Sequence, residues 1–248
     1  AFLLNRSSDL EIFQTGVTQN HMVSLQSRSD KATTRVSLSY RNQTGTVPNT
    51  DQTRYSAQFN TQMTLNRFFS FDFAGNYTRT ESENLVNQGY RANNPMNNLI
   101  AWSGRQINMA SLKANWDQKD ELGNYTYYNW NTSYHINPYF NVYMNTNSYQ
   151  RDRVFGKTSL YFQPWTWLKI EGRVGFDYYG SKMMEKTYYN PDDPQGAFYN
   201  TNISNSELNA DLIAYFNQTF GDFNLTAILG ANYRDAKYVY DAIGADAL

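Results

Sequence analysis

The residues of this chain that could do chemistry are few: two histidines, two groups of loop carboxylates and one dense run of aromatic side chains. His21 and His135 stand far apart, and the chain has no cysteine. Two isolated histidines cannot complete a tetrahedral metal site without carboxylate ligands. No glycine-rich phosphate loop, G-x-S-x-G or H-E-x-x-H motif occurs. The sequence therefore predicts no enzyme, no cofactor and no metal centre.

The carboxylates gather in two short stretches. DQKDELG contains Asp117, Asp120 and Glu121, and NPDDPQG contains Asp192 and Asp193. A hard cation needs several oxygen ligands from a shaped loop, and neither stretch has the spacing of an EF-hand. We therefore expect solvated loop acids, with a structural calcium ion on a surface loop as the alternative.

The aromatic run lies in GNYTYYNWNTSYHINPYFNVYMNTNSY, residues 123–149. Aromatic faces can stack on sugar rings, and the neighbouring asparagine amides can bind hydroxyl groups. The alternative, which we favour, is that this segment folds into its own β-hairpins and packs against neighbouring loops or a lid protein, since tyrosine is common at interfaces. The candidate substrate-binding residues are Tyr125, Tyr127, Trp130, Tyr134 and Tyr139.

The elements that must position these residues are β-strands, because apolar residues recur with a period of two. In 168–180, LKIEGRVGFDYYG, an apolar set alternates with a charged set. Most such segments have ten or more residues, whereas soluble strands usually have about 5–6 and a tilted strand crosses a bilayer in about 9–11. The expected strands are 17–27, 33–43, 54–65, 68–80, 154–162, 168–180, 206–220 and 223–240.

The connections between the expected strands are alternately short and long, and this alternation distinguishes membrane barrels from soluble sheets. Short links at 28–31, 66–67, 163–166 and 221–222 alternate with long ones at 44–53, 81–153 and 181–205. Outer-membrane barrels have short periplasmic turns and long extracellular loops. We therefore predict an all-β, transmembrane antiparallel barrel segment in the outer membrane, with its apolar face toward lipid. The residues expected to face the lumen or a plug are Arg35, Arg54, Asp72, Lys169, Glu171, Arg173 and Asp177.

Composition agrees with this class. Charged residues are 17% of the chain and aromatic residues another 17%, and the net charge is −1 without a basic cluster. Nucleic acid is therefore not an expected partner. No run of about 18 apolar residues occurs, so no membrane-spanning helix is predicted.

Aromatic residues near the strand ends suit interfacial girdles; they include Tyr40, Tyr77, Tyr178, Tyr179, Trp165, Trp167, Phe220, Phe223, Tyr238 and Tyr240.

Residues 9–51 carry a more specific pattern. Phe13–Gly16, Asn20, Ser29–Lys31 and Asn42–Gly45 stand at matching positions of the SusC-like family of TonB-dependent outer-membrane transporters from Bacteroidetes, which this stretch resembles. Arg28 replaces a usual glycine of that family. The segment 152–179 is also similar.

The resemblance implies a 22-stranded barrel around an N-terminal plug, energised by TonB through a TonB box and covered by a SusD-like surface lipoprotein. Its substrates would be oligosaccharides or peptides. We find eight strands and neither plug nor TonB box in 1–248, so we expect an internal barrel segment. Two alternatives stay open. One is a self-contained eight-stranded barrel serving as an anchor, adhesin or surface enzyme, in which the first and last strands pair. The other is a soluble carbohydrate-binding β-sandwich, in which Leu168, Ile170, Val174 and Phe176 are buried against a second sheet.

Overall fold

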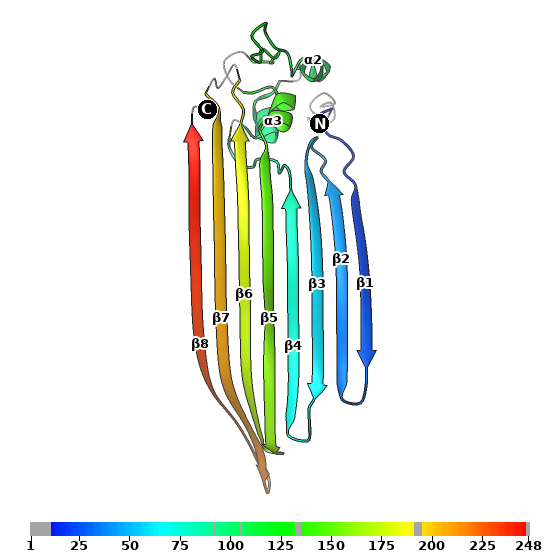
Figure 1. The fold of residues 1–248 in the computed structure, drawn as a ribbon, viewed down its shortest axis with the longest axis vertical. Helices are drawn as coiled ribbons and strands as arrows, with labels where there is room; N and C mark the ends of the chain where they lie inside the picture. Colours follow the sequence, from blue (N-terminus) through cyan, green and yellow to red (C-terminus); the bar gives the residue numbers. More distant parts are fainter. Residues whose placement is uncertain (1–10, 92, 105, 132–134, 191–194, 247–248) are drawn as a thin grey trace.

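The computed structural model describes residues 11–91, 93–104, 106–131, 135–190 and 195–246, and these form one antiparallel sheet with a small cap at one end (Figure 1). The eight strands follow one another in chain order. They are β1 (Thr18–Arg28), β2 (Ala32–Thr44), β3 (Asp51–Thr64), β4 (Phe69–Ser82), β5 (Asn147–Trp165), β6 (Leu168–Thr187), β7 (Ala197–Phe220) and β8 (Phe223–Asp246).

All eight predicted strands exist, but the last four are longer than predicted. β7 begins at Ala197 instead of 206, and β6 continues to Thr187. The prediction of a loop over 181–205 is therefore wrong in its length, because only residues 188–196 connect β6 and β7. The added residues are mostly polar, and the few apolar ones, such as Met183, Met184 and Phe198, do not alternate with polar residues, so the sequence carries no strand signal there. Backbone pairing continues regardless, because the ladder hydrogen bonds do not depend on side-chain polarity. The other long connections are 45–50 and 83–146.

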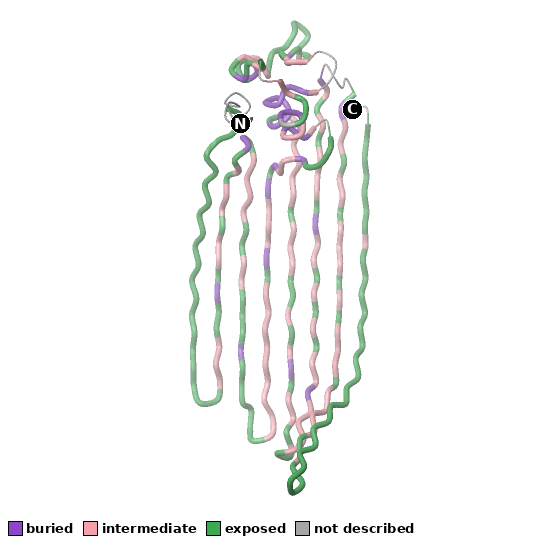
Figure 2. The backbone as a smooth tube through the Cα atoms, turned by 180° about the vertical axis from the view of Figure 1, so that it is seen from behind, coloured by how far each residue is buried: buried purple, intermediate pink, exposed green. Residues whose placement is uncertain are grey.

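The sheet is open. Among the described residues β1 pairs only with β2, and β8 pairs only with β7. Both edge strands are exposed along nearly their whole length (Figure 2). A closed eight-stranded barrel and a two-sheet sandwich are therefore not what these residues form. None of the described helices is long and apolar enough to cross a membrane.

The register sorts the side chains into two faces, since directly paired residues of an antiparallel sheet lie on the same face. We call the face that carries Val174 and Phe176 the apolar face, and the opposite face, with Arg173 and Asp177, the polar face. One row of the apolar face runs from Val36 through Phe59, Gly75, Gly156 and Phe176 to Leu208. The predicted girdle residues divide: Tyr40, Tyr77 and Tyr178 lie on the apolar face, whereas Tyr179, Tyr238 and Tyr240 lie on the polar face.

The boundary of the apolar face is slanted relative to the register rows of the sheet. It ends at Tyr40 on β2 and at Tyr233 on β8, where Asp235 follows. The register row through Tyr40 reaches β8 at Val239, six residues past Tyr233. Six residues rise about 20 Å, and the six strand spacings measure about 29 Å, so the slope is about 35°. Transmembrane barrel strands tilt by about 35–45°.

The cap is the long connection 83–146 together with residues near Ile12. It contains α1 (Pro95–Asn97), η1 (Asn98–Trp102), α2 (Met109–Ala114) and α3 (Pro138–Met144). We expected short strands here, and this was wrong: the described residues form helical turns and one isolated bridge, Lys119↔Tyr125. Asparagine N-caps explain the difference, because α1 and α3 each begin with Asn-Pro, a favoured start of a helix.

The buried hydrophobic residues all lie outside the strands, and the buried residues within the strands are polar or charged. Leu112 and Phe140 are fully buried, and they belong to two adjoining clusters in the cap. The sheet thus has no core of its own, and its apolar face stays uncovered by the described residues. The core members are Ile12, Val47, Leu99, Met109, Leu112, Tyr127, Ile136, Tyr139, Phe140 and Val142.

Candidate functional site

The seven residues predicted to face the lumen or a plug all lie on the polar face. On β5–β8 three arginines of this face form ion pairs with carboxylates of neighbouring strands. Arg153 and Arg234 each donate two hydrogen bonds to one carboxylate, a bidentate geometry that is the strongest form of this pair. The three pairs are Arg153–Asp177, Arg173–Asp211 at 2.8 Å and Arg234–Glu207 at 2.9 Å.

Glu171 is the most enclosed charge of this half, with 6% of its surface exposed. Its two carboxylate oxygens accept hydrogen bonds from Ser159 Oγ at 3.1 Å and Tyr215 Oη at 2.9 Å. The Lys169 ammonium lies 4.0 Å from the centre of the Tyr161 ring. Because a buried carboxylate must be hydrogen-bonded, this cluster holds β5, β6 and β7 in register.

The other half of the polar face is different. Arg35 donates a hydrogen bond to Ser24 Oγ at 3.5 Å. None of Arg35, Arg54 and Asp72 forms an ion pair among the described residues. Arg35 and Asp72 line a shallow cleft of about 220 Å³ together with Lys157. The ion-pair ladder of β5–β8 thus gives way to unpaired charges on β2–β5. Sequence reasoning did not single out Lys157.

The candidate substrate-binding aromatics are mostly structural. Tyr127 and Tyr139 are 6% and 3% exposed, in the core of the cap, and burial raises the pKa of Tyr139. Tyr125 is half-buried and packs edge-on against Phe140 at 5.0 Å. The buried tyrosines therefore contribute to the packing of the cap. Tyr134 lies outside the described residues.

A short row of rings reaches the surface of the cap. Trp130 stacks on His135 at 5.2 Å, His135 contacts Trp102 at 5.6 Å, and Trp102 contacts Tyr90 at 6.4 Å. Tyr90 and Trp102 are 78% and 50% exposed. Only Trp130 was among the predicted residues. The path of the loop in three dimensions brings Tyr90, Trp102 and His135 close to Trp130. No spacing of residues in the sequence predicts this row.

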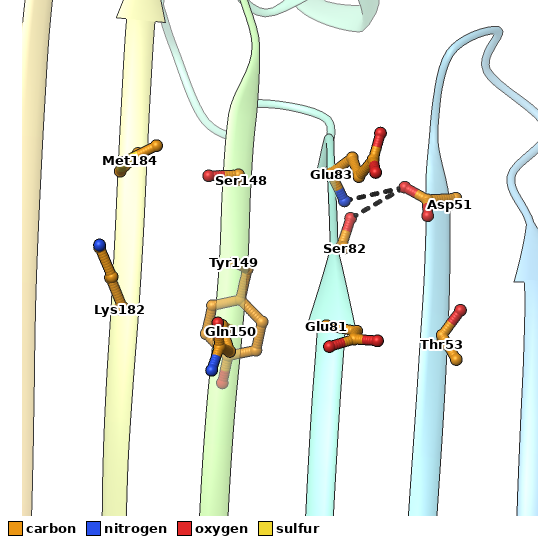
Figure 3. Close-up of a pocket in the computed structure, with 10 residues that line it drawn as sticks. All are labelled: Asp51, Thr53, Glu81, Ser82, Glu83, Ser148, Tyr149, Gln150, Lys182 and Met184. Atoms are coloured by element: carbon orange, nitrogen blue, oxygen red, sulfur yellow. Dashed lines mark hydrogen bonds between the residues drawn. The ribbon is translucent and has the colours of Figure 1, made fainter.

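Beyond the tyrosines of the apolar face, the same side of the sheet becomes polar. A cleft of about 460 Å³ lies there between β3, β4, β5 and β6 (Figure 3). Asp51 accepts hydrogen bonds from Ser82 Oγ at 3.4 Å and Glu83 N at 3.1 Å, which joins the ends of β3 and β4. Glu81 and Lys182 lie on the same register row. These charges mark where the apolar face ends.

Of the loop carboxylates, Asp120 serves the local structure of its turn. Asp120 Oδ1 accepts hydrogen bonds from Asn124 N at 2.8 Å and Leu122 N at 2.9 Å, and Asn124 Nδ2 donates to Oδ2 at 3.1 Å. These bonds, the Asn124 amide first, lower the pKa of Asp120. Asp192 and Asp193 lie outside the described residues. Within the described part of the chain, no three histidine or acidic side chains gather into a possible metal site.

Comparison with known proteins supports the fold. No known family profile and no curated protein sequence matches the chain. It is similar to solved structures of the RagAB peptide importer, in the "closed-closed" state with TM-score 0.71 and 20% identity over 96% of this chain and 26% of that chain. The "open-open" state gives 0.70 and 19%, again over 96% and 26%. BauA, the ferric preacinetobactin receptor from Acinetobacter baumannii, gives 0.54 and 8% over 93% and 31%.

The chain therefore has an all-β fold like that of part of these importer and receptor chains, in eight antiparallel strands. It spans about a quarter of the length of the RagAB chains that it matches.

Proposed function

We propose that this chain forms part of the barrel wall of an outer-membrane importer similar to the SusC-like TonB-dependent transporters. One observation carries the proposal: a continuous apolar face spans eight long strands and is slanted at about 35°, as in membrane barrels. On β8 the face extends from Phe223 to Tyr233. Ten residues at that tilt give a height of about 27 Å, close to the apolar band of about 25 Å in outer-membrane barrels.

In this proposal the apolar face contacts outer-membrane lipid, and the polar face lines a lumen or contacts a plug. The open edges of β1 and β8 then pair with further strands, because unpaired backbone groups are not tolerated in lipid. The cap and the long connections 45–50, 83–146 and 188–196 lie on the extracellular side. Coupling to TonB would use a plug region and TonB box that we do not find in 1–248.

The proposed role is nutrient import without catalysis. The RagAB structures are named as a peptide importer, so peptides stand beside oligosaccharides as candidate substrates. A SusD-like lipoprotein would sit over the extracellular side, where the cap offers exposed aromatic residues such as Tyr90 and Trp102. Aromatic residues are enriched in protein interfaces and suit such a partner.

Cysteine scanning of β6 tests the membrane orientation, and the absence of native cysteine removes background labelling. Single cysteines at 173–176, placed in the full-length protein in lipid vesicles, carry a nitroxide spin label. We expect oxygen to relax the labels at 174 and 176 most, and a water-soluble nickel chelate to relax those at 173 and 175 most, because the faces alternate. Equal water accessibility at all four positions would contradict the proposal.

Uptake separates the substrate classes. Cells with and without the protein are given labelled oligopeptides or labelled oligosaccharides, and an uncoupler serves as the control for energised import. Protein-dependent, uncoupler-sensitive uptake of either class is the expected result. Uptake that is identical in both strains for both classes would refute an import function.

A further inference from the structure

The polar face is divided by charge. On β6–β8 every arginine has a carboxylate partner, Arg173 with Asp211 and Arg234 with Glu207. On β1–β5 the same face carries seven basic side chains and a single carboxylate, Asp72, among the described residues, and of the seven only Arg153 has a carboxylate partner, Asp177 of β6. The net charge of −1 hides this separation. The seven are Arg28 at a turn, then Arg35, Arg41, Arg54, Arg151, Arg153 and Lys157.

Three of these arginines share one register row. Arg41 pairs directly with Arg54, and Thr80 links Arg54 to Arg151. Like charges directly opposite on a sheet are destabilising, with Cβ atoms about 5 Å apart. The side chain of Arg41 donates to Gln43 Oε1 at 2.9 Å, whereas the guanidinium of Arg54 has no hydrogen bond or ion pair among the described residues. The Nε of Arg151 is buried without a hydrogen-bond partner, although its guanidinium lies 4.0 Å from the Tyr179 ring centre.

A second basic row lies six residues further along the strands. Arg35 and Lys157 share it, separated by Asn60 and Ala74. Six residues of strand span about 20 Å, a length that six residues of an extended ligand chain also cover.

The wall between the two rows is hollowed, and its lining combines three amide side chains with Phe155 and small residues. A cleft of about 400 Å³ has Ala74 in its lining, with the side chains of Gln58, Asn60 and Asn76 beside it. Amide side chains both donate and accept, so they can bind the N–H and C=O groups of a peptide backbone. The small side chain of Ala74 leaves room for that backbone to approach.

We propose that the basic half of the polar face binds an extended acidic peptide, with one carboxylate on the Arg41–Arg54–Arg151 row and a second about six residues away on the Arg35–Lys157 row. The planar guanidinium fork matches a carboxylate, and an anion between Arg41 and Arg54 removes their repulsion. This rests on the proposed function, because it names the substrate class of that importer.

The test uses the full-length protein in lipid nanodiscs and a fluorescent peptide with two glutamates six positions apart. Binding is measured by anisotropy beside the same peptide carrying glutamines. We expect the acidic peptide to bind at least about tenfold more tightly, and Arg41→Gln with Arg54→Gln to abolish this preference. Raising the salt concentration weakens the preference as well. Arg67→Gln, at an exposed turn on the opposite end of the strands, is the matched control and leaves it unchanged.

Thermal unfolding of the ligand-free double variant distinguishes binding from a structural role. Removing two opposed like charges leaves the protein equally stable or more stable, whereas structurally required arginines would make it less stable. Equal affinity for both peptides, or a preference that survives the double substitution, overturns the inference. Protein-dependent import of the glutamine peptide without acidic preference leaves the proposed transport function standing. If the spin labels at 173–176 of β6 show no alternation between lipid and water accessibility, the proposed transport function itself is refuted.

Discussion

Asn137 offers the sharpest test of how the cap is held together. Its side chain is fully buried and makes contacts in two directions. Oδ1 caps α3 by accepting from Tyr139 N at 2.9 Å, and Nδ2 donates to Leu112 O at 3.1 Å and Tyr128 O at 2.7 Å. Asn137→Ala therefore removes a helix cap and leaves two carbonyls without this donor.

The expected cost follows from these contacts. An N-cap contributes about 1 kcal/mol. Each hydrogen bond to a buried carbonyl contributes about 1 kcal/mol as well. Asn137→Ala should therefore destabilise the cap by about 3 kcal/mol, which is a factor of about 150 in its opening equilibrium. Asn108→Ala is the matched control, since Asn108 is exposed and only caps α2, accepting from Ser111 N at 3.0 Å.

Hydrogen exchange of the intact protein measures the effect without unfolding the strands. The reporting amides are Asn141 N and Asn145 N, which form the helical bonds of α3. In Asn137→Ala they should exchange about 150-fold faster, and in Asn108→Ala the amide of Leu112 should exchange only about fivefold faster. Comparable changes in the two variants would refute the reasoning, because the two carbonyl bonds would then contribute nothing.

Three further outcomes are expected. Leu229→Arg on the apolar face should destabilise the folded protein in lipid by about 2–4 kcal/mol, and Gly230→Arg on the polar face, directly opposite the uncharged Ile213, should not, as measured by urea unfolding in vesicles. Gly156→Ala should cost about 1–3 kcal/mol, because its Cβ would lie 2.6 Å from Ala74 O, whereas Gly172→Ala meets nothing within 4 Å; unfolding of both variants tests this. The Asp120 turn, whose folded-state pKa is lowered, should keep its stabilisation above the ordinary pKa of aspartate and lose it as the pH falls through the lowered value. Faster exchange of the Asn124 amide, corrected for intrinsic pH dependence, would report the loss.

The strands that could be predicted are those with one apolar and one polar face. Leu168, Ile170, Val174 and Phe176 alternate with charges, and this fixes both the strand and its two faces. Where both faces are polar, as around Asn200 and Asn202, the alternation carries no signal. Those residues are still strand, because the pairing of β6 with β7 continues through backbone hydrogen bonds.

The cap could not be predicted in the same way. Tyrosine and asparagine at high density fit a binding surface and a folded core equally well. Only the packing shows that Tyr127 and Tyr139 are interior, and that Asn94 and Asn137 begin helices with the proline that follows. The Asn-Pro pairs are the local signal that could have indicated helices instead of short strands.

The sequence alone determined the strands, their two faces and the alternation of short and long connections, because these depend on the period of side chains along a single strand. Only the tertiary structure decided what depends on register between strands. This includes the slant of the apolar face and the ion pair of Arg173 with Asp211. It also includes the shared row of Arg41, Arg54 and Arg151, none of which has a carboxylate partner among the described residues. Residues in such a row lie far apart in the chain, and a shift of one residue would place them on opposite faces.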